Sequence, residues 1–122
     1  MNIYILPTDK PSRLHITGKL SLYPNGLSPK SQGLCKNQHV YITNDEEIKE
    51  GDYVFVNCSE EEIEEVRLIK GYYNEQFLFE DKGQIHIDYC KKIIQTTDRD
   101  LIFEGVKPID DEFLQWFVKN NN

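Results

Sequence analysis

Two cysteine–histidine pairs with the same spacing are the first residues in this sequence whose types suggest chemistry. Three residues separate Cys35 from His39, and three separate His86 from Cys90. Four such side chains could hold a zinc ion tetrahedrally. In an extended strand, however, residues four positions apart lie about 13 Å from each other, at about 3.3 Å per residue. We therefore expect these side chains to bind no zinc, and the sequence indicates no other metal and no cofactor.

The same pairs are candidates for a cysteine nucleophile activated by a histidine. Such a pair needs a third group that orients the histidine, and the sequence offers no residue for that role. With Cys58 the chain has three cysteines, an odd number that implies no framework of paired disulfides. We name no catalytic residue and expect a protein that is not an enzyme. A small enzyme of unspecified reaction is one alternative.

Two short polar stretches, residues 7–13 and 96–100, combine hydroxyl groups, carboxylates and arginine. Backbone N–H groups at a capped turn, with an arginine beside them, can bind an anion. Neither stretch has the glycine-rich pattern of a phosphate-binding loop. We expect these side chains mainly to close loops and cap turns. If the ligand is a small anion or a nucleotide-derived signal, the binding residues are Thr8, Asp9, Arg13, Thr97, Asp98 and Arg99.

Carboxylates cluster in three runs, at residues 45–50, 60–65 and 110–112. An acid–base pair needs one carboxyl group in an apolar pocket, and runs this polar are usually solvated. None shows the alternating Asp and Asn of a calcium-binding loop. The first run lies between two predicted strands that would hold it rigidly. It is therefore the best candidate for recognising a basic partner, through Asp45, Glu46, Glu47 and Glu50.

Charge is unevenly distributed along the 122 residues. The net charge is −7, yet residues 1–43 contain five lysines or arginines and a single acid, whereas the remainder is strongly acidic. The overall negative charge disfavours nucleic acid as a partner, because phosphate contacts dominate that affinity. A surface with both signs would suit a partner with both signs, or a second copy of the chain.

The elements that must position these residues are mostly strands. Val40–Thr43 and Tyr53–Val56 are β-rich runs, and between them we expect a short helix at Asp45–Lys49, capped by Thr43 or Asn44 and ended by Gly51. Further turn signals, among them Asn74-Glu75, recur about eight to twelve residues apart. The pattern predicts a mainly β, or β-rich α+β, fold. We expect an SH3-like small antiparallel barrel or sandwich of about six to eight strands.

The end of the chain changes character. Residues 96–102 predict a single capped helical turn, and residues 109–119 a C-terminal helix with acids at its N-terminus. Phe113, Leu114, Phe117 and Val118 form its apolar stripe. We expect one domain over residues 1–122, with a mobile loop at 24–38 that is rich in Ser, Lys, Gly and Asn.

No run of the chain approaches the about 20 apolar residues of a membrane span. The start, Met1-Asn2-Ile3-Tyr4, has no basic region and only a short apolar run, unlike a signal peptide. We therefore expect a cytoplasmic protein with no membrane partner.

Four stretches together resemble a group of short proteins, without an assigned activity, that occur in bacteriophages and in the bacteria they infect. They are LPTDKPSRL at 6–14, VYITNDEEIKEGDYV at 40–54, KIIQTTDRDLI at 92–102 and GVKPIDDEFLQWFVKN at 105–120. The resemblance covers nearly half of the chain. It implies a phage origin and carries no catalytic residues with it.

Small accessory phage proteins usually bind something that belongs to the host. The resemblance therefore implies a non-enzymatic accessory protein that binds a host protein and modulates it, inside the host bacterial cell. The first alternative is a small-molecule binder that sequesters an anionic or nucleotide-derived signal through residues 7–13 and 96–100.

Overall fold

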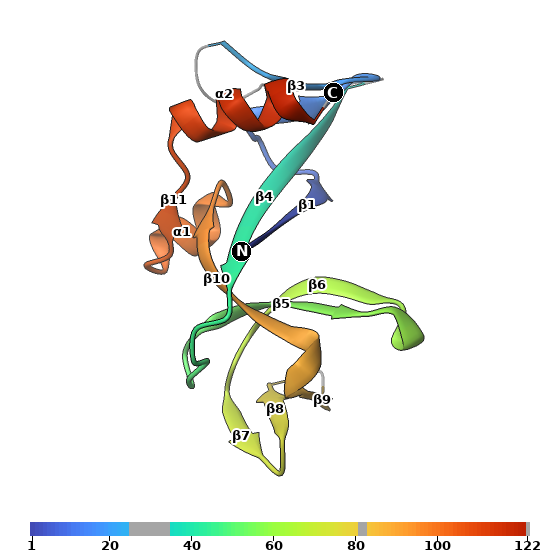
Figure 1. The fold of residues 1–122 in the computed structure, drawn as a ribbon, viewed down its shortest axis with the longest axis vertical. Helices are drawn as coiled ribbons and strands as arrows, with labels where there is room; N and C mark the ends of the chain where they lie inside the picture. Colours follow the sequence, from blue (N-terminus) through green and yellow to red (C-terminus); the bar gives the residue numbers. More distant parts are fainter. Residues whose placement is uncertain (25–34, 81–82, 122) are drawn as a thin grey trace. The chain divides into compact units, whose positions relative to one another are not determined.

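The computed structural model describes residues 1–24, 35–80 and 83–121 of the chain. These residues form eleven β-strands, two α-helices and two short 3₁₀-helices (Figure 1). The chain divides into two compact units: unit 1 comprises Met1–Ile3 and Ile42–Ile94, and unit 2 comprises Tyr4–Tyr41 and Gln95–Asn122. The single domain expected from the length stays a prediction.

Unit 1 is organised around β5 (Tyr53–Cys58), which lies between two antiparallel neighbours. These neighbours are β6 (Ile63–Leu68) and the first half of β10 (Cys90–Thr96). Val54, Phe55 and Val56 are all completely buried. Since successive side chains of a strand point to opposite faces, β5 is covered on both faces. Its unbroken apolar run predicts this burial.

A second antiparallel sheet in unit 1 consists of β7 (Gly71–Tyr73), β8 (Gln76–Phe79) and β9 (Gly83–His86). Asn74 and Glu75 link the first two strands with φ angles of 52° and 63°. Two adjacent left-handed residues are what a two-residue hairpin turn of type I′ requires. The predicted turn at Asn74-Glu75 is therefore confirmed, and it pairs Tyr72 with Phe77.

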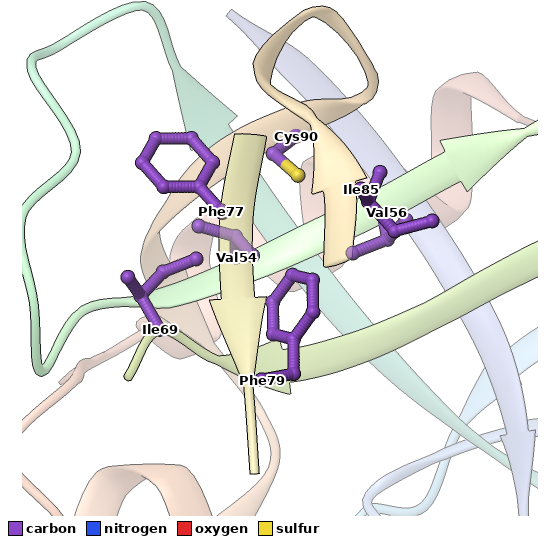
Figure 2. Packing of buried hydrophobic residues seen from close by; sticks show 7 residues of the cluster. All are labelled: Val54, Val56, Ile69, Phe77, Phe79, Ile85 and Cys90. Atoms are coloured by element: carbon purple, nitrogen blue, oxygen red, sulfur yellow. The ribbon is translucent and has the colours of Figure 1, made fainter. Parts of the chain in front are cut away.

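The core of unit 1 combines side chains from both sheets (Figure 2). Strands β5, β8, β9 and β10 contribute to it, together with the residue after β6. Its buried members are Val54, Val56, Ile69, Phe77, Phe79, Ile85 and Cys90. Ile48, Ile63 and Ile87 are partly buried and pack against this cluster. Ile48 directly follows the acidic residues 45–47, and Ile87 lies shortly before β10, so the core holds both of these segments.

Arg67 on β6 is a charged residue with only 9% of its surface exposed. Its Nη2 lies 2.9 Å from Glu65 Oε1, and its guanidinium carbon lies 5.0 Å from the centre of the Phe79 ring. Nε and Nη1 have no hydrogen-bond partner among the described residues. The ion pair and the aromatic face offset part of the desolvation of this charge.

Unit 2 contains a short antiparallel sheet in which β2 (Leu14–Ile16) lies between β3 (Leu20–Leu22) and β4 (Lys36–Asn44). Leu14 is fully buried and pairs with Leu22 on one side and with Gln38 on the other. β1 (Asn2–Thr8) pairs with β4, and β11 (Lys107–Pro108) runs parallel to the end of β10. The long strands β4 and β10 contribute residues to both units.

Two helices complete unit 2. In α1 (Arg99–Phe103), Asp98 is the N-cap and its side chain accepts a hydrogen bond from the backbone N–H of Asp100. In α2 (Asp111–Asn120), Asp110 is the N-cap and accepts from the N–H of Phe113 at 2.8 Å. These caps explain why α2 begins at Asp111, two residues later than the sequence predicts.

The fold class is confirmed: the described chain is a β-rich α+β protein, mostly antiparallel, with a short helix and a C-terminal helix. Its described strands do not close into a barrel. They also outnumber the expected six to eight, because several are only two or three residues long.

The predicted helix at Asp45–Lys49 does not form. Side chains satisfy the backbone there instead, since Asn44 Oδ1 accepts from the N–H of Glu46 and Asp52 Oδ2 accepts from the N–H of Lys49. Such local bonds compete with helical ones.

The sequence predicts a mobile loop at 24–38, of which residues 25–34 lie outside the described part of the chain. The prediction is wrong for residues 36–38, which belong to a strand. Lys36, Asn37 and Gln38 belong to β4, and the last two are buried. Asn37 Nδ2 donates to the carbonyl of Lys10, and Ser12 Oγ donates to the carbonyl of Gln38. Polar residues are therefore buried here because the segment around Ser12 satisfies them.

The packing of α2 yields a stability prediction. Leu114 and Phe117 are buried, α2 contacts β3, and the neighbouring Trp116 is 55% exposed. Phe117→Ala should therefore lower the free energy of unfolding by about 3–5 kcal/mol, because it leaves a cavity. Gln115→Ala, at an exposed position of the same helix, is the matched control and should change it by about 0.5 kcal/mol or less.

Chemical denaturation followed by far-ultraviolet circular dichroism measures both variants. Parent-like unfolding of Phe117→Ala would contradict the docking of α2 on the core of unit 2.

Candidate functional site

The acidic run after β4 forms a tightly held loop in unit 1. Besides the two side-chain bonds from Asn44 and Asp52, the N–H of Gly51 donates to the carbonyl of Ile69 at 2.9 Å. Gly51 has a φ angle of +92°, which favours glycine. The loop is therefore fixed at both ends, by β4 and by the segment that follows β6.

An open pocket of about 730 Å³ lies beside this loop. Its polar lining consists of Asn44, Asp45, Glu46, Glu47, Asp88 and Lys91. Its apolar lining consists of Ile48, Tyr72, Phe77, Ile87 and Cys90. All of these residues belong to unit 1. The pocket thus combines an apolar floor from the core with four carboxylates.

Two of the four carboxylates are already paired with lysines. Asp45 Oδ1 lies 2.9 Å from Lys91 Nζ, and Glu46 Oε2 lies 3.7 Å from Lys92 Nζ. The hydrogen bond from Lys91, with its positive charge, lowers the pKa of Asp45. These pairs attach the loop to β10.

Glu47 and Asp88 lack such a partner among the described residues. Glu47 is exposed and forms no ion pair with a described residue. Asp88 Oδ2 lies 3.5 Å from His86 Nδ1, but this nitrogen accepts a hydrogen bond from the N–H of Asp88. This nitrogen therefore carries a lone pair and has no proton to donate to the Asp88 carboxylate. In the part of the chain that the structure describes, two negative charges in the pocket are therefore left without a lysine or arginine partner.

Of the four acidic residues that the sequence singles out, three line this pocket. Glu50 is exposed and does not line it. Sequence reasoning missed the aromatic and apolar lining and Asp88. One signal was available, because the predicted two-residue turn at Asn74-Glu75 places Tyr72 directly opposite Phe77.

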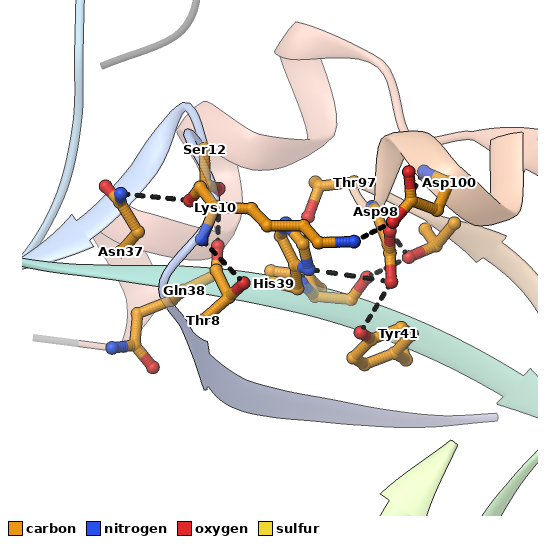
Figure 3. Close-up of polar contacts among 12 residues, drawn as sticks. Thr8, Lys10, Ser12, Asn37, Gln38, His39, Tyr41, Thr97, Asp98 and Asp100 are labelled. Atoms are coloured by element: carbon orange, nitrogen blue, oxygen red, sulfur yellow. Dashed lines mark hydrogen bonds and ion pairs between the residues drawn. The ribbon is translucent and has the colours of Figure 1, made fainter. Parts of the chain in front are cut away.

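In unit 2 the structure brings together the two polar stretches at 7–13 and 96–100 (Figure 3). Lys10 Nζ forms an ion pair with Asp100 that joins them. Within the first stretch, Thr8 Oγ1 accepts from the N–H of Lys10 at 3.1 Å, and Asp9 is exposed.

Two threonines bind the second stretch to β4. Thr96 Oγ1 donates to the carbonyl of Val40 at 2.8 Å, and Thr97 Oγ1 accepts from the N–H of Val40 at 2.9 Å. The N–H of Thr97 also donates to the Val40 carbonyl, at 3.1 Å. Both backbone polar groups of Val40 are hydrogen-bonded in this way, so the two threonines attach the second stretch to the buried strand β4.

Asp98 lies at the centre of the cluster in Figure 3. Its Oδ2 accepts from the hydroxyl of Tyr41 at 3.0 Å and lies 3.6 Å from Nδ1 of His39. Burial, and then the negative charge of Asp98, raise the pKa of Tyr41. Burial lowers the pKa of His39 despite the neighbouring carboxylate.

The arginines of the two stretches differ in their surroundings. Arg13 Nε donates to the carbonyl of Tyr23 at 3.1 Å, and its guanidinium pairs with Asp111. Arg99 is exposed on α1. Because Lys10 and Arg13 already face carboxylates, and because Asp98 and Asp100 lie in the cluster, the local charge does not favour an anion here.

The cysteine–histidine pairs do not face each other as ligands. Cys35 Sγ lies 2.7 Å from the hydroxyl of Tyr23, and Cys90 Sγ lies 3.9 Å from the backbone carbonyl of His86. Burial raises the pKa of Cys90 to about 11. Among the described residues, no group of three or more His, Cys, Asp or Glu side chains could hold a metal ion.

Comparisons with known proteins find no match to a family model, to a curated protein or to a solved structure. Within the described part of the chain, no helix is both long and apolar enough to span a membrane.

The buried histidine gives a prediction of pH dependence. Because burial lowers the pKa of His39 below its ordinary 6.5, the unfolded chain binds a proton there more readily than the folded chain. The free energy of unfolding should therefore fall as the pH drops below about 6.5, where the unfolded residue becomes protonated. His39→Gln should show a smaller fall.

Trp116 is the only tryptophan of the chain and lies in unit 2, so its fluorescence during urea unfolding reports on this unit. Parent and variant are compared by the slope of the free energy of unfolding against pH between pH 7.5 and pH 5. The absolute values are not compared, because the substitution also changes packing. Burial lowers the pKa of His15 as well, so some slope should remain in the variant. Identical slopes in parent and variant would contradict the account of His39.

The absence of zinc also remains a prediction with a direct test. Purified protein should contain no stoichiometric zinc, and a chelator should leave its melting temperature unchanged. One zinc per chain in elemental analysis, lost on Cys90→Ser or Cys35→Ser, would overturn it.

Proposed function

We propose that this chain is a binding protein without catalytic activity, which recognises a positively charged surface of a partner protein through the pocket of unit 1. The observation that carries the proposal is the pocket itself. Asp45, Glu46 and Glu47, which the sequence indicates as a partner-binding run, surround an apolar floor in an open cavity of about 730 Å³.

Both parts of this surface have a physical role in binding. Exposed carboxylates on a rigid loop speed the encounter with a basic partner, and this effect weakens as salt increases. Aromatic side chains supply most of the energy at many interfaces. Tyr72 and Tyr73 are 59% and 71% exposed beside Phe77, so unit 1 presents aromatic area next to its charges.

The surroundings of the reactive side chains support binding over catalysis. A nucleophilic cysteine needs a lowered pKa, whereas burial raises that of Cys90. A catalytic carboxyl group needs an apolar environment, whereas Asp45, Glu46 and Glu47 are exposed.

The resemblance to short phage proteins supports a partner from the host bacterium. On this proposal the chain acts in the host cytoplasm as an accessory protein, and it modulates the host protein by occupying a basic surface.

Charge reversal in the pocket tests the proposal. Glu46→Lys with Glu47→Lys should slow association with the partner at low salt by at least tenfold, because electrostatic steering changes association rate constants by factors of about 10–1000. The partner is identified by capture from host extract, with the parent chain as bait, and is then purified. Association rates are measured at several salt concentrations.

Glu60→Lys with Glu61→Lys is the matched control. It makes the same charge change at exposed residues of the 3₁₀-helix η1 (Ser59–Glu61), which does not line the pocket. Equal slowing by both double variants would show that the general acidity of the chain, and not the pocket, drives association. Parent-like association of the pocket variant at every salt concentration would refute the proposal.

A further inference from the structure

We infer that the pocket of unit 1 takes a lysine or arginine side chain from an extended segment of the partner protein. This inference rests on the proposed function and specifies the chemistry of recognition. The cationic head would lie between Glu47 and Asp88, and the aliphatic stem would lie on the apolar floor.

The distribution of ion pairs in the pocket indicates where a cation is missing. Asp45 pairs with Lys91, and Glu46 shares Lys92 with Asp52. Glu47 and Asp88 have no lysine or arginine partner among the described residues. These two residues lie in different segments, the loop after β4 and the 3₁₀-helix η2 (Ile87–Tyr89). The fold, and not the run of acids alone, therefore brings them to one cavity.

The apolar lining fits the rest of such a side chain. Ile48, Phe77 and Ile87 provide the floor, and long basic side chains bury their methylene groups on surfaces of this kind. The rings of Tyr72 and Phe77 lie 5.8 Å apart at 62°. Aromatic rings attract cations by their electron-rich faces, so this pair adds to the preference for a positive head group.

Other ligand classes fit the same cavity less well. An anion would meet four carboxylates, and a wholly apolar ligand would desolvate them without compensation. The described residues of the pocket include no group of three metal ligands. The volume of about 730 Å³ lies within the range of about 300–1,000 Å³ of sites for drug-sized ligands. It therefore leaves room for an apolar neighbour of the basic residue in the partner segment.

The test uses two fluorescein-labelled pentapeptides, one with a central arginine between two leucines and one with citrulline in its place. Citrulline keeps the shape of arginine and removes its charge. Fluorescence anisotropy at low salt gives Kd for each. The arginine peptide should bind the parent chain at least tenfold more tightly than the citrulline peptide.

Variants locate the binding. Glu47→Gln with Asp88→Asn should weaken binding of the arginine peptide at least tenfold and change binding of the citrulline peptide by less than twofold. Glu60→Gln with Glu61→Gln removes the same charge outside the pocket and should have less than a twofold effect. Tyr72→Ala, at an exposed ring, should weaken binding severalfold without disturbing the buried core.

The outcomes separate this inference from the proposed function. Equal affinity for the two peptides, no binding up to 1 mM, or equal losses in the pocket and control variants would each overturn the inference. If the host partner's association still depended on Glu46 and Glu47, the proposed function would stand without it. Tight, pocket-dependent binding of the arginine peptide, with no host protein captured in a charge-dependent manner, would instead remove the proposed function.

Discussion

The burial of β5 on both faces is the constraint on which the rest of unit 1 depends. A strand that exposes neither face needs a neighbour on each edge and apolar cover above and below. β6 and β10 provide the edges, and the cluster around Phe77 and Ile85 provides part of the cover. The segment before β5 lies at the surface, where polar residues are solvated. The acidic loop occupies this position, held by Gly51 and Asp52.

The same constraint explains the mixed character of the pocket. Its floor is the edge of the core, because Phe77 and Cys90 belong to the buried cluster and Ile48 and Ile87 pack against it. Its rim consists of the polar residues in the segments that flank the core, the acidic loop after β4 and the residues around Asp88. On β10, Lys91 pairs with Asp45, whereas Lys92 Nζ lies 3.7 Å from Glu46 Oε2 and 3.6 Å from Asp52 Oδ2. Glu47 and Asp88 are the lining carboxylates without a lysine or arginine partner among the described residues, so the pocket carries negative charge that these residues do not compensate.

Much of the fold can be predicted from the sequence because the signals are local. The apolar run of β5, the turn at Asn74-Glu75, the positive φ of Gly51 and the stripe of α2 each depend on neighbouring residues. The first half of β4 could not be predicted in this way. Asn37 and Gln38 read as loop residues, and their burial depends on partners near residue 12, about 26 positions away.

The candidate site was predictable only in part, for the same reason. The acidic run identifies Asp45, Glu46 and Glu47, but a run of carboxylates does not reveal an apolar floor. That floor comes from strands and turns as distant as Tyr72 and Ile87. Asp88 carried no signal of its own, because it lies outside the three carboxylate runs of the sequence. In unit 2 the hydroxyl and carboxylate groups expected to contact an anion instead bind β4 and cap α1.

The claim that the pocket of unit 1 receives a basic side chain can be tested by observing the contact itself. Isotope-filtered nuclear Overhauser spectra would be recorded on labelled protein saturated with the unlabelled arginine peptide. The account predicts contacts from the arginine methylene groups to the methyl groups of Ile48 and Ile87 and to the ring of Phe77. Contacts confined to other residues, such as those around Glu60–Glu65, would contradict it.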